Sequence, residues 1–143
     1  MHGLMAIQRY PEDWDGVLVG APNIDPIRDL AGISARGQRW ANSPAGRIPV
    51  RKLPLIQKTA LNACREEANV VDGIASDPRF CRYDPAILSC KGVETDQCLT
   101  PPQVDTLRQI YEGLRDSDGT NIHPGFTPTM EADSGWEQLM PVT

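Results

Sequence analysis

The sequence predicts an α/β segment at its start, followed by a mostly α, loop-rich and disulfide-bonded body. Three observations predict this class. A short helical pattern leads through a proline into a buried-strand pattern before residue 22. The 143 residues include 12 glycines and 13 prolines, a high share of residues that interrupt regular structure. All four cysteines lie between residues 64 and 98.

The first element is predicted to be a helix that feeds a strand. Leu4 and Ile7 share one helical face and are expected in the core. Pro11 ends the helix, because proline lacks the amide donor and restricts the residue before it. The apolar run 17–19 is typical of an inner strand of a parallel sheet that is covered on both faces. A parallel strand needs neighbours, so this segment is expected to belong to a larger sheet.

Residues 23–50 are predicted to be irregular or weakly helical, although Ile27, Leu30 and Ile33 have helical spacing. Residues 53–64 are predicted to form a helix, since apolar residues recur along one stripe. The members of this stripe are Leu53, Ile56, Ala60, Leu61 and Cys64.

Residues 65–99 are predicted to be a loop region held by cysteines, and a helix follows at 100–113. Thr100 is a typical N-cap, prolines occupy the first helical positions, and Gln103 completes a capping box. Gly113 is a plausible end of this helix. Asp118-Gly119 indicates a tight turn, consistent with a hairpin.

The composition excludes two classes of partner. The net charge of −5 argues against nucleic acid, which binds clustered cations. No apolar run approaches the roughly 20 residues that span a bilayer, so no membrane partner is expected. We therefore expect neither kind of partner.

The cysteines indicate disulfides rather than a zinc site. No pair has Cys-x-x-Cys spacing, and neither His2 nor His123 is near enough in sequence to complete a zinc module. Two disulfides in an oxidising compartment are one interpretation, with three possible connectivities, and four buried thiols are the other.

The longest recognisable pattern is the first one. Residues 3–22 read Gly-Leu-Met-Ala-Ile-Gln-Arg-Tyr-Pro-Glu-Asp-Trp-Asp-Gly-Val-Leu-Val-Gly-Ala-Pro. This pattern closely resembles the segment that follows the Gly-x-Ser-x-Gly-Gly nucleophile elbow in tannases, feruloyl esterases and related aromatic-ester hydrolases. The resemblance continues through Asp72-Gly73-Ile74, Cys98-Leu99-Thr100 and Pro124-Gly125-Phe126, and so spans nearly the whole chain.

The resemblance implies an α/β-hydrolase fold with an inserted lid domain. Residues 1–22 would supply the helix and one core strand after the elbow, and residues 23–143 a lid that is incomplete at its C-terminus. The nucleophilic serine would precede Met1, and the aspartate and histidine of the triad would follow Thr143. The chain is then an internal part of the enzyme that contains no catalytic residue, and alone it is expected to be inactive.

The resemblance also implies the disulfide pairing and a metal loop. The pairs would be Cys64–Cys81 and Cys90–Cys98. A structural calcium in the family uses three aspartates and two backbone carbonyls, which fall here on Arg65, Ala68, Val70, Asp72 and Ile74.

Two of these positions depart from the calcium pattern, because Arg65 and Ala68 replace aspartates. Fewer anionic ligands mean weaker calcium binding. Three readings stay open: calcium held with help from Glu66, Glu67 or Asn69, an ion pair between Arg65 and Asp72, or a solvated acidic loop. Apart from this possible calcium, no cofactor is expected.

The expected function is that of a secreted or periplasmic serine carboxylic ester hydrolase acting on small aromatic or phenolic acid esters. Trp40, Phe126 and Trp136 are the candidates for contact with the aromatic acyl group, with ordinary packing as the alternative. Another class is a free-standing, disulfide-bonded binding module derived from the lid, and a third is a full-length protein that has lost its triad.

Overall fold

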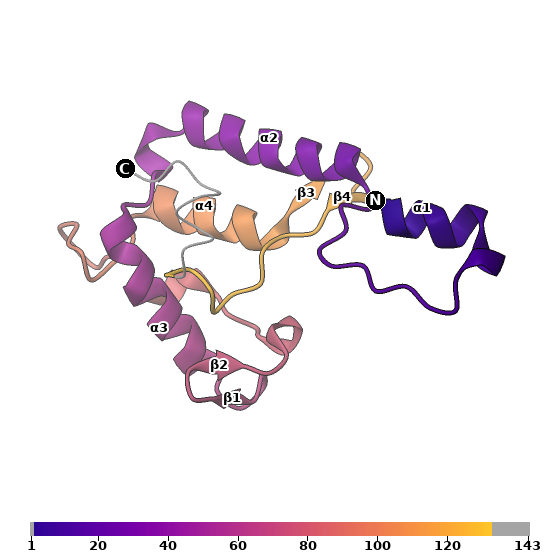
Figure 1. Cartoon of the computed structure of the whole chain (residues 1–143). Helices are drawn as coiled ribbons and strands as arrows, with labels where there is room; N and C mark the ends of the chain where they lie inside the picture. Colours follow the sequence, from indigo (N-terminus) through magenta and orange to yellow (C-terminus); the bar gives the residue numbers. More distant parts are fainter. Residues whose placement is uncertain (1, 133–143) are drawn as a thin grey trace.

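The computed structural model describes residues 2–132, apart from the side chains of residues 40 and 41. Within these residues, four α-helices and two small hairpins form, and long irregular segments join the elements (Figure 1). The helices are α1 (His2–Arg9), α2 (Pro26–Asn42), α3 (Leu53–Ala63) and α4 (Pro101–Glu112). The strands are β1 (Val70–Val71), β2 (Ile74–Ala75), β3 (Leu114–Arg115) and β4 (Asn121–His123), and each sheet is an antiparallel pair. Short 3-10 helices cover Pro11–Asp13, Pro44–Gly46, Val50–Lys52, Pro78–Phe80 and Pro85–Leu88.

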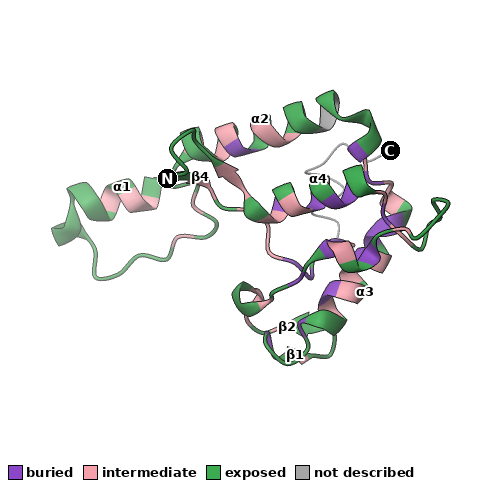
Figure 2. Cartoon of the chain, turned by 180° about the vertical axis from the view of Figure 1, so that it is seen from behind, coloured by how far each residue is buried: buried purple, intermediate pink, exposed green. Residues whose placement is uncertain are grey.

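Helices α3 and α4 confirm the sequence prediction and carry the core. In α4, Gln103 N donates to Thr100 Oγ1 at 3.4 Å, and Thr100 N donates to Gln103 Oε1 at 3.1 Å. This is the predicted capping box, which satisfies two amides at the helix start. The helix ends at Gly113, which has φ +80°. Figure 2 shows buried residues concentrated on these two helices and the loop between them. The core consists of Ile48, Leu53, Ile56, Ala60, Cys64, Ala68, Tyr83, Leu88, Leu99, Val104, Leu107 and Ile110.

Both disulfides form with the implied pairing. Cys64 is bonded to Cys81 and Cys90 to Cys98, which leaves no free cysteine. The first bond ties the end of α3 to the segment before Tyr83, and the second closes a short loop before α4. Each restricts the unfolded chain within the region that the sequence predicted to be a pinned loop.

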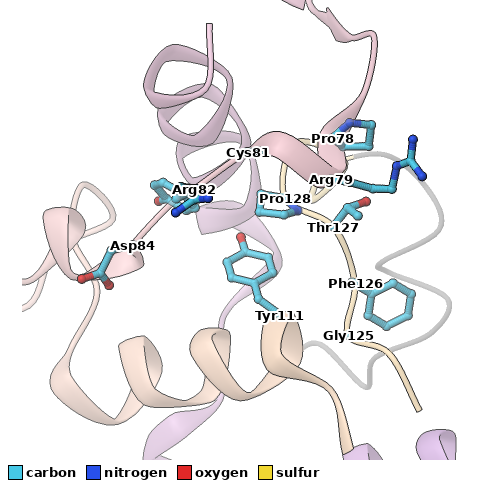
Figure 3. A pocket seen from close by; sticks show the side chains of 11 residues that line it. Pro78, Arg79, Cys81, Arg82, Asp84, Tyr111, Gly125, Phe126, Thr127 and Pro128 are labelled. Atoms are coloured by element: carbon cyan, nitrogen blue, oxygen red, sulfur yellow. The ribbon is translucent and has the colours of Figure 1, made fainter. Parts of the chain in front are cut away.

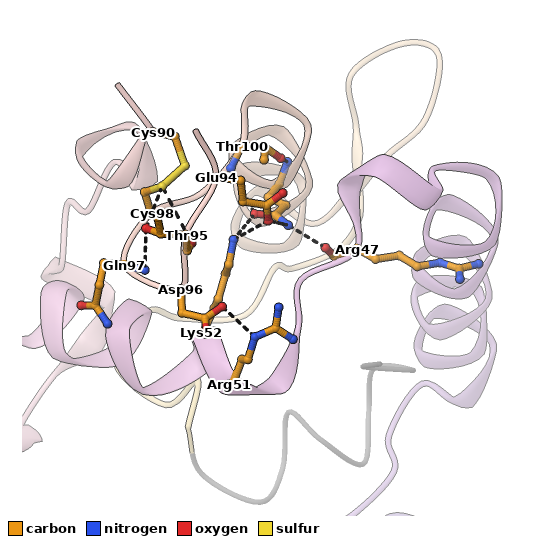
Figure 4. Close-up of polar contacts among 11 residues, drawn as sticks. Arg47, Arg51, Lys52, Cys90, Glu94, Thr95, Asp96, Gln97, Cys98 and Thr100 are labelled. Carbon is orange, nitrogen blue, oxygen red and sulfur yellow. Dashed lines mark hydrogen bonds and ion pairs between the residues drawn. A yellow bond between two sulfur atoms is a disulfide. The ribbon is translucent and has the colours of Figure 1, made fainter. Parts of the chain in front are cut away.

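A buried lysine joins three segments of the core (Figure 4). Lys52 is fully buried, and its ammonium donates to Glu94 Oε1 at 2.6 Å and to Gln103 Oε1 at 3.1 Å. The Gln103 amide also donates to the Arg47 carbonyl at 3.0 Å and to Glu94 Oε1 at 3.2 Å. The ammonium is thus paired, which is the condition under which burial of a charge is tolerated.

Helix α2 corrects the prediction of an irregular or weakly helical segment. It runs for 17 residues, and its first turn is capped by Asp25, whose carboxylate accepts from Arg28 N at 3.2 Å. Its apolar residues are exposed, with Ile27 at 80% and Leu30 at 62%. The capped start and the packing of α2 against β4, rather than burial of these residues, support this helix.

The core strand predicted at 17–19 does not form within the described residues. Its pairing inside a larger sheet stays a prediction. The helix before it forms as α1, and the side chains of Val17 and Val19 lie close against Gly3. The strand itself does not form, Leu18 is fully exposed, and Ile7 is 39% exposed. A strand needs a neighbour to accept its backbone hydrogen bonds, and no strand in residues 2–132 pairs with this one. Figure 1 shows α1 and this segment beside the rest of the molecule.

The hairpin predicted at Asp118-Gly119 is confirmed by β3 and β4. The Asp116 carboxylate accepts from the amides of Asp118 and Thr120 at 3.0 and 2.8 Å, which closes the turn. Strand β4 then returns along α2, where the ring of His123 lies against Gly32. None of the helices in the described residues is both long enough and apolar enough to span a bilayer.

Candidate functional site

A pocket of about 500 Å³ opens where the segment after the first disulfide meets the end of α4 (Figure 3). Three parts of the chain form it: residues 78–84, Tyr111 of α4, and residues 125–128. In this view the Tyr111 side chain points between Arg82 and Pro128, with Phe126 and Asp84 toward opposite edges. The lining residues are Pro78, Arg79, Cys81, Arg82, Tyr83, Asp84, Tyr111, Gly125, Phe126, Thr127 and Pro128.

One wall of the pocket is fixed to the end of α4. Phe126 N donates to the Ile110 carbonyl at 3.0 Å. The Tyr111 hydroxyl donates to Glu131 Oε1 at 2.5 Å, and Thr129 N donates to both Glu131 oxygens at 3.1 Å. Glu131 is fully buried, and these donors satisfy part of its carboxylate. The segment 125–131 is thereby held in one position against the helix.

The opposite wall is Tyr83, which is only 8% exposed. Its ring meets the ring of Tyr111 edge to face, with centroids 6.1 Å apart. Its buried hydroxyl has no hydrogen-bond partner among the described residues. Burial, and then the charge of Glu131, raise the pKa of Tyr83 far above its usual value, and burial likewise raises the pKa of Tyr111. Both phenols therefore remain protonated donors, and an unpartnered hydroxyl costs about 1–3 kcal/mol.

The charges around the pocket are mostly paired. Asp77 accepts from Arg79 Nε at 2.8 Å and from its Nη2 at 2.6 Å, and this contact lowers the pKa of Asp77. Asp84 accepts from Ala86 N and from Arg108, and both contacts lower its pKa. Arg82 is the exception.

Arg82 lies at the rim of the pocket and is exposed. Its backbone amide donates to Glu67 at 3.3 Å, whereas its guanidinium has no ion pair within residues 2–132. The rim therefore presents one cation whose charge no described carboxylate neutralises.

Of the three aromatic residues predicted to contact substrate, Phe126 lines this pocket. The guanidinium of Arg36 lies 4.7 Å from the centre of its ring. The side chain of Trp40 and the whole of Trp136 lie outside the described residues. Sequence reasoning missed Tyr83 and Tyr111. No local pattern marks them, since they are 28 positions apart and meet only through the packing of α4.

The predicted metal loop forms the β1–β2 hairpin. Asp72 is exposed at its tip with φ +52°, while Ala68 is 1% exposed and belongs to the core. Of the three side chains at the expected aspartate positions, only that of Asp72 offers a carboxylate, and Arg65 contributes a cation. Within residues 2–132, no group of three or more acidic, histidine or cysteine side chains converges. The donor set does not fit the calcium site that the resemblance implies.

Backbone and disulfide contacts hold this loop instead. The Ala68 carbonyl accepts from Ser76 N at 3.0 Å, and Val70 N donates to the Arg65 carbonyl at 3.0 Å. The Cys64–Cys81 bond closes the loop at its base. Arg65 makes no ion pair with Asp72 in the described part of the chain.

His123 is less exposed than a surface residue would be. Its side chain is 18% exposed, and Nε2 lies 3.6 Å from Asp29 Oδ1. Its Nδ1 contacts the Pro124 carbonyl at 2.5 Å. Nucleophilic hydrolysis needs a serine beside the base. No described serine is hydrogen-bonded to this histidine, and the expectation that the chain lacks a catalytic residue stays a prediction.

Comparisons with known proteins cover nearly the whole chain. A sequence model of the family described as "Tannase and feruloyl esterase" matches residues 1–142. An uncharacterized esterase of Xanthomonas campestris pv. campestris is 39% identical over 137 residues, which are 94% of this chain and 24% of that protein. A probable feruloyl esterase B-2 of Aspergillus flavus is 29% identical over 92% of this chain and 26% of its own length. The chain thus spans about a quarter of the length of these curated relatives.

Solved structures give the same result for the fold. The crystal structure of feruloyl esterase B from Aspergillus oryzae matches 91% of this chain and 27% of its own, with a TM-score of 0.77 and 25% identity. A crystal structure of an esterase from the same species matches with a TM-score of 0.74 and 28% identity, over 91% of this chain and 26% of that one. The sequence match over residues 1–142 and the shared fold together lead to one conclusion: the chain belongs to the tannase and feruloyl esterase family.

Proposed function

We propose that this chain is part of a serine carboxylic ester hydrolase that acts on esters of phenolic acids. Residues 1–22 would contribute a helix and a strand to the catalytic core, and residues 23–143 a lid. The nucleophile, base and acid would come from outside these residues. The observation that carries the proposal is the family match over residues 1–142 combined with a coverage of about a quarter of each relative.

In this proposal the lid positions the substrate and limits the access of water. The serine of the complete protein attacks the ester carbonyl, the alcohol leaves, and water hydrolyses the acyl-enzyme to release the acid. The residues of this chain take no proton in these steps. Phe126 contacts the aromatic acyl group, since this residue lines a pocket whose wall is held to α4 by the Phe126 amide.

The isolated chain and the complete reading frame give opposite expectations in one assay. We expect the 143-residue chain to leave methyl ferulate intact and the protein translated from the whole frame to hydrolyse it. Sequencing the gene upstream of the Met1 codon shows whether a Gly-x-Ser-x-Gly-Gly motif precedes it. Hydrolysis by the isolated chain, or an upstream frame closed by a stop codon, would contradict the proposal.

A matched pair of variants tests the role of Phe126. In the complete protein, Phe126→Ala is expected to raise KM for methyl ferulate, because the ring contact is lost. Phe80→Ala is the control, since Phe80 is 61% exposed and does not line the pocket. Equal effects of the two substitutions on KM would contradict a role of Phe126 in substrate binding.

One observation favours the second candidate, a binding module without catalytic activity. Among the described residues, the core lies between residues 48 and 110 and includes none from α1 or α2, while two disulfides stabilise the same region. A lid-derived module of this kind would fold and bind a phenolic ester without hydrolysing it. The same disulfides support a secreted or periplasmic location, because such bonds persist in oxidising compartments.

A further inference from the structure

The Cys90–Cys98 bond closes an exposed loop that supplies two carboxylates to a neighbouring 3-10 helix. Residues 91–97 are all exposed, and the disulfide joins the two ends of this loop. Among the described residues, the hydrogen bonds and ion pairs that tie the loop to other segments come from the carboxylates of Glu94 and Asp96. The attachment of the loop therefore depends on its covalent closure and on these two side chains.

The two carboxylates meet consecutive cations (Figure 4). Asp96 Oδ1 accepts from Arg51 Nε at 2.6 Å, and Glu94 Oε1 accepts from Lys52 Nζ at 2.6 Å. The second acceptor of the buried Lys52 ammonium is Gln103 Oε1 at 3.1 Å, which belongs to a neutral amide. Within the described residues, Glu94 is thus the anion that compensates this ammonium, and its loss leaves a buried charge that is energetically unfavourable.

The two disulfides differ in how a thiol can exchange with them. Cys64 is fully buried, so exchange at Cys81 has to expel a thiolate into the core. Cys90 and Cys98 are both partly exposed. Thr95 Oγ1 lies 3.6 Å from Cys98 Sγ, and the hydroxyl is the donor because a disulfide sulfur carries no proton. A departing Cys98 thiolate therefore already has a donor beside it.

We propose that the Cys90–Cys98 bond is an exchange site for a small thiol, and that its reduction releases Glu94 from Lys52. The thiolate attacks Cys90 Sγ and forms a mixed disulfide, while the Cys98 sulfur leaves as a thiolate and takes a proton from water. A second thiolate then displaces the Cys90 sulfur, so the reductant is oxidised to its disulfide and both cysteines become thiols. The opened loop no longer holds its carboxylates against the 3-10 helix.

The effect of reduction reaches the start of α4 through Gln103. Its Oε1 accepts from Lys52 and from the Thr100 amide, at 3.1 Å in each case. Its amide group donates to Glu94 and to the Arg47 carbonyl. Release of Glu94 removes one of the contacts that fix this side chain, so the capping box at Thr100 opens more often. The stability of the helix start thus depends on the redox state of the loop.

Brief treatment of the oxidised 143-residue chain with dithiothreitol, followed by alkylation and peptide mapping, tests the exchange site. We expect Cys90 and Cys98 to be alkylated at least about tenfold faster than Cys64 and Cys81, since exchange at the second pair expels a buried thiolate. Equal rates for the two pairs, or earlier alkylation of Cys64 and Cys81, would overturn the inference.

Hydrogen exchange of the chain reduced at the short loop alone tests the coupling to α4. The amides of Thr100 and Gln103 are expected to exchange about fivefold faster. The Gly113 amide, which donates to the Gln109 carbonyl at the other end of the helix, is the internal control and should not change. Unchanged exchange at Thr100 and Gln103 would overturn the proposed release of Glu94.

A matched pair of variants tests whether the carboxylate carries this coupling. In the oxidised chain, Glu94→Ala should reproduce the faster exchange at Thr100, and reduction should add little to it, because both changes remove the same contact from Lys52. Glu12→Ala is the control, since it removes an exposed glutamate outside the loop. Equal effects of the two substitutions, or full additivity of Glu94→Ala with reduction, would overturn the inference. None of these measurements depends on ester hydrolysis.

Discussion

Among the described glycines, Gly125 is where an added methyl group is expected to lower the free energy of unfolding most. A Cβ on this residue would lie 1.8 Å from the Tyr111 carbonyl oxygen and 2.3 Å from its carbon. It would also lie 2.7 Å from the Ile110 oxygen. All three are backbone atoms at the end of α4, so no side chain can rotate away to make room.

The size of the effect follows from this overlap. A non-bonded carbon normally stays about 3.5 Å from its neighbours, so the segment after β4 would have to move by more than about 1 Å. Overpacking of this kind costs about 1–3 kcal/mol, and the shift also breaks the 3.0 Å bond from Phe126 N to the Ile110 carbonyl, worth about 1 kcal/mol. We therefore expect Gly125→Ala to lower the free energy of unfolding by about 3 kcal/mol.

Thermal and denaturant unfolding of the oxidised chain measure this loss, which corresponds to a fall of about 10 °C in Tm. Two glycines are matched controls. Gly119 has φ +82° but open space around it, so Gly119→Ala should cost only about 1 kcal/mol from backbone strain. Gly92 has open space and no positive φ, so Gly92→Ala should stay within about 0.5 kcal/mol of the parent. A Gly125→Ala variant as stable as Gly92→Ala would refute the reasoning.

Three further predictions concern the other supports of the fold. The hydrogen bond from Lys52 holds the pKa of Glu94 below its usual value. This pair therefore stabilises the fold at neutral pH, and its contribution is lost as pH falls through the lowered pKa. When stability is measured against pH in acid, Glu94→Gln should show a smaller fall than the parent, and identical curves would contradict this. Removal of the Cys64–Cys81 bond should cost about 3 kcal/mol and removal of the shorter bond about 2.5 kcal/mol, because the loops span separations of 17 and 8 residues; denaturant unfolding of the two serine double variants checks the order. Calcium at about 5 mM should change Tm by less than about 1 °C, since Asp72 is the one carboxylate at the expected aspartate positions, and a large rise would show that the loop binds the metal.

Elements that depend on neighbouring residues were predictable. The capping box at Thr100 and Gln103 fixes the start of α4, and the turn at Asp118-Gly119 fixes the β3–β4 hairpin. Both are decided within a few residues by hydrogen bonds between side chain and backbone. The start of α2 carries a similar signal at Asp25, whose carboxylate accepts from Arg28 N.

Elements that depend on distant partners were not predictable. The run 17–19 has the composition of a core strand, yet it forms none because no described strand pairs with it. The candidate site shows the same limit. Phe126 was anticipated as an aromatic contact, whereas Tyr83, Tyr111 and Arg82 become one pocket only when α4 packs against the disulfide-bonded segment.

The sequence by itself determined the family, the helix caps, the hairpin turn and, through the resemblance, the disulfide pairing. The tertiary structure alone decided that Lys52 is buried and paired with Glu94 and Gln103, and that the Tyr83 hydroxyl is buried with no partner among the described residues. The reason is physical. Caps and turns are interactions over three or four residues, whereas burial and charge pairing are set by which segments pack together, 42 residues apart in the case of Lys52 and Glu94.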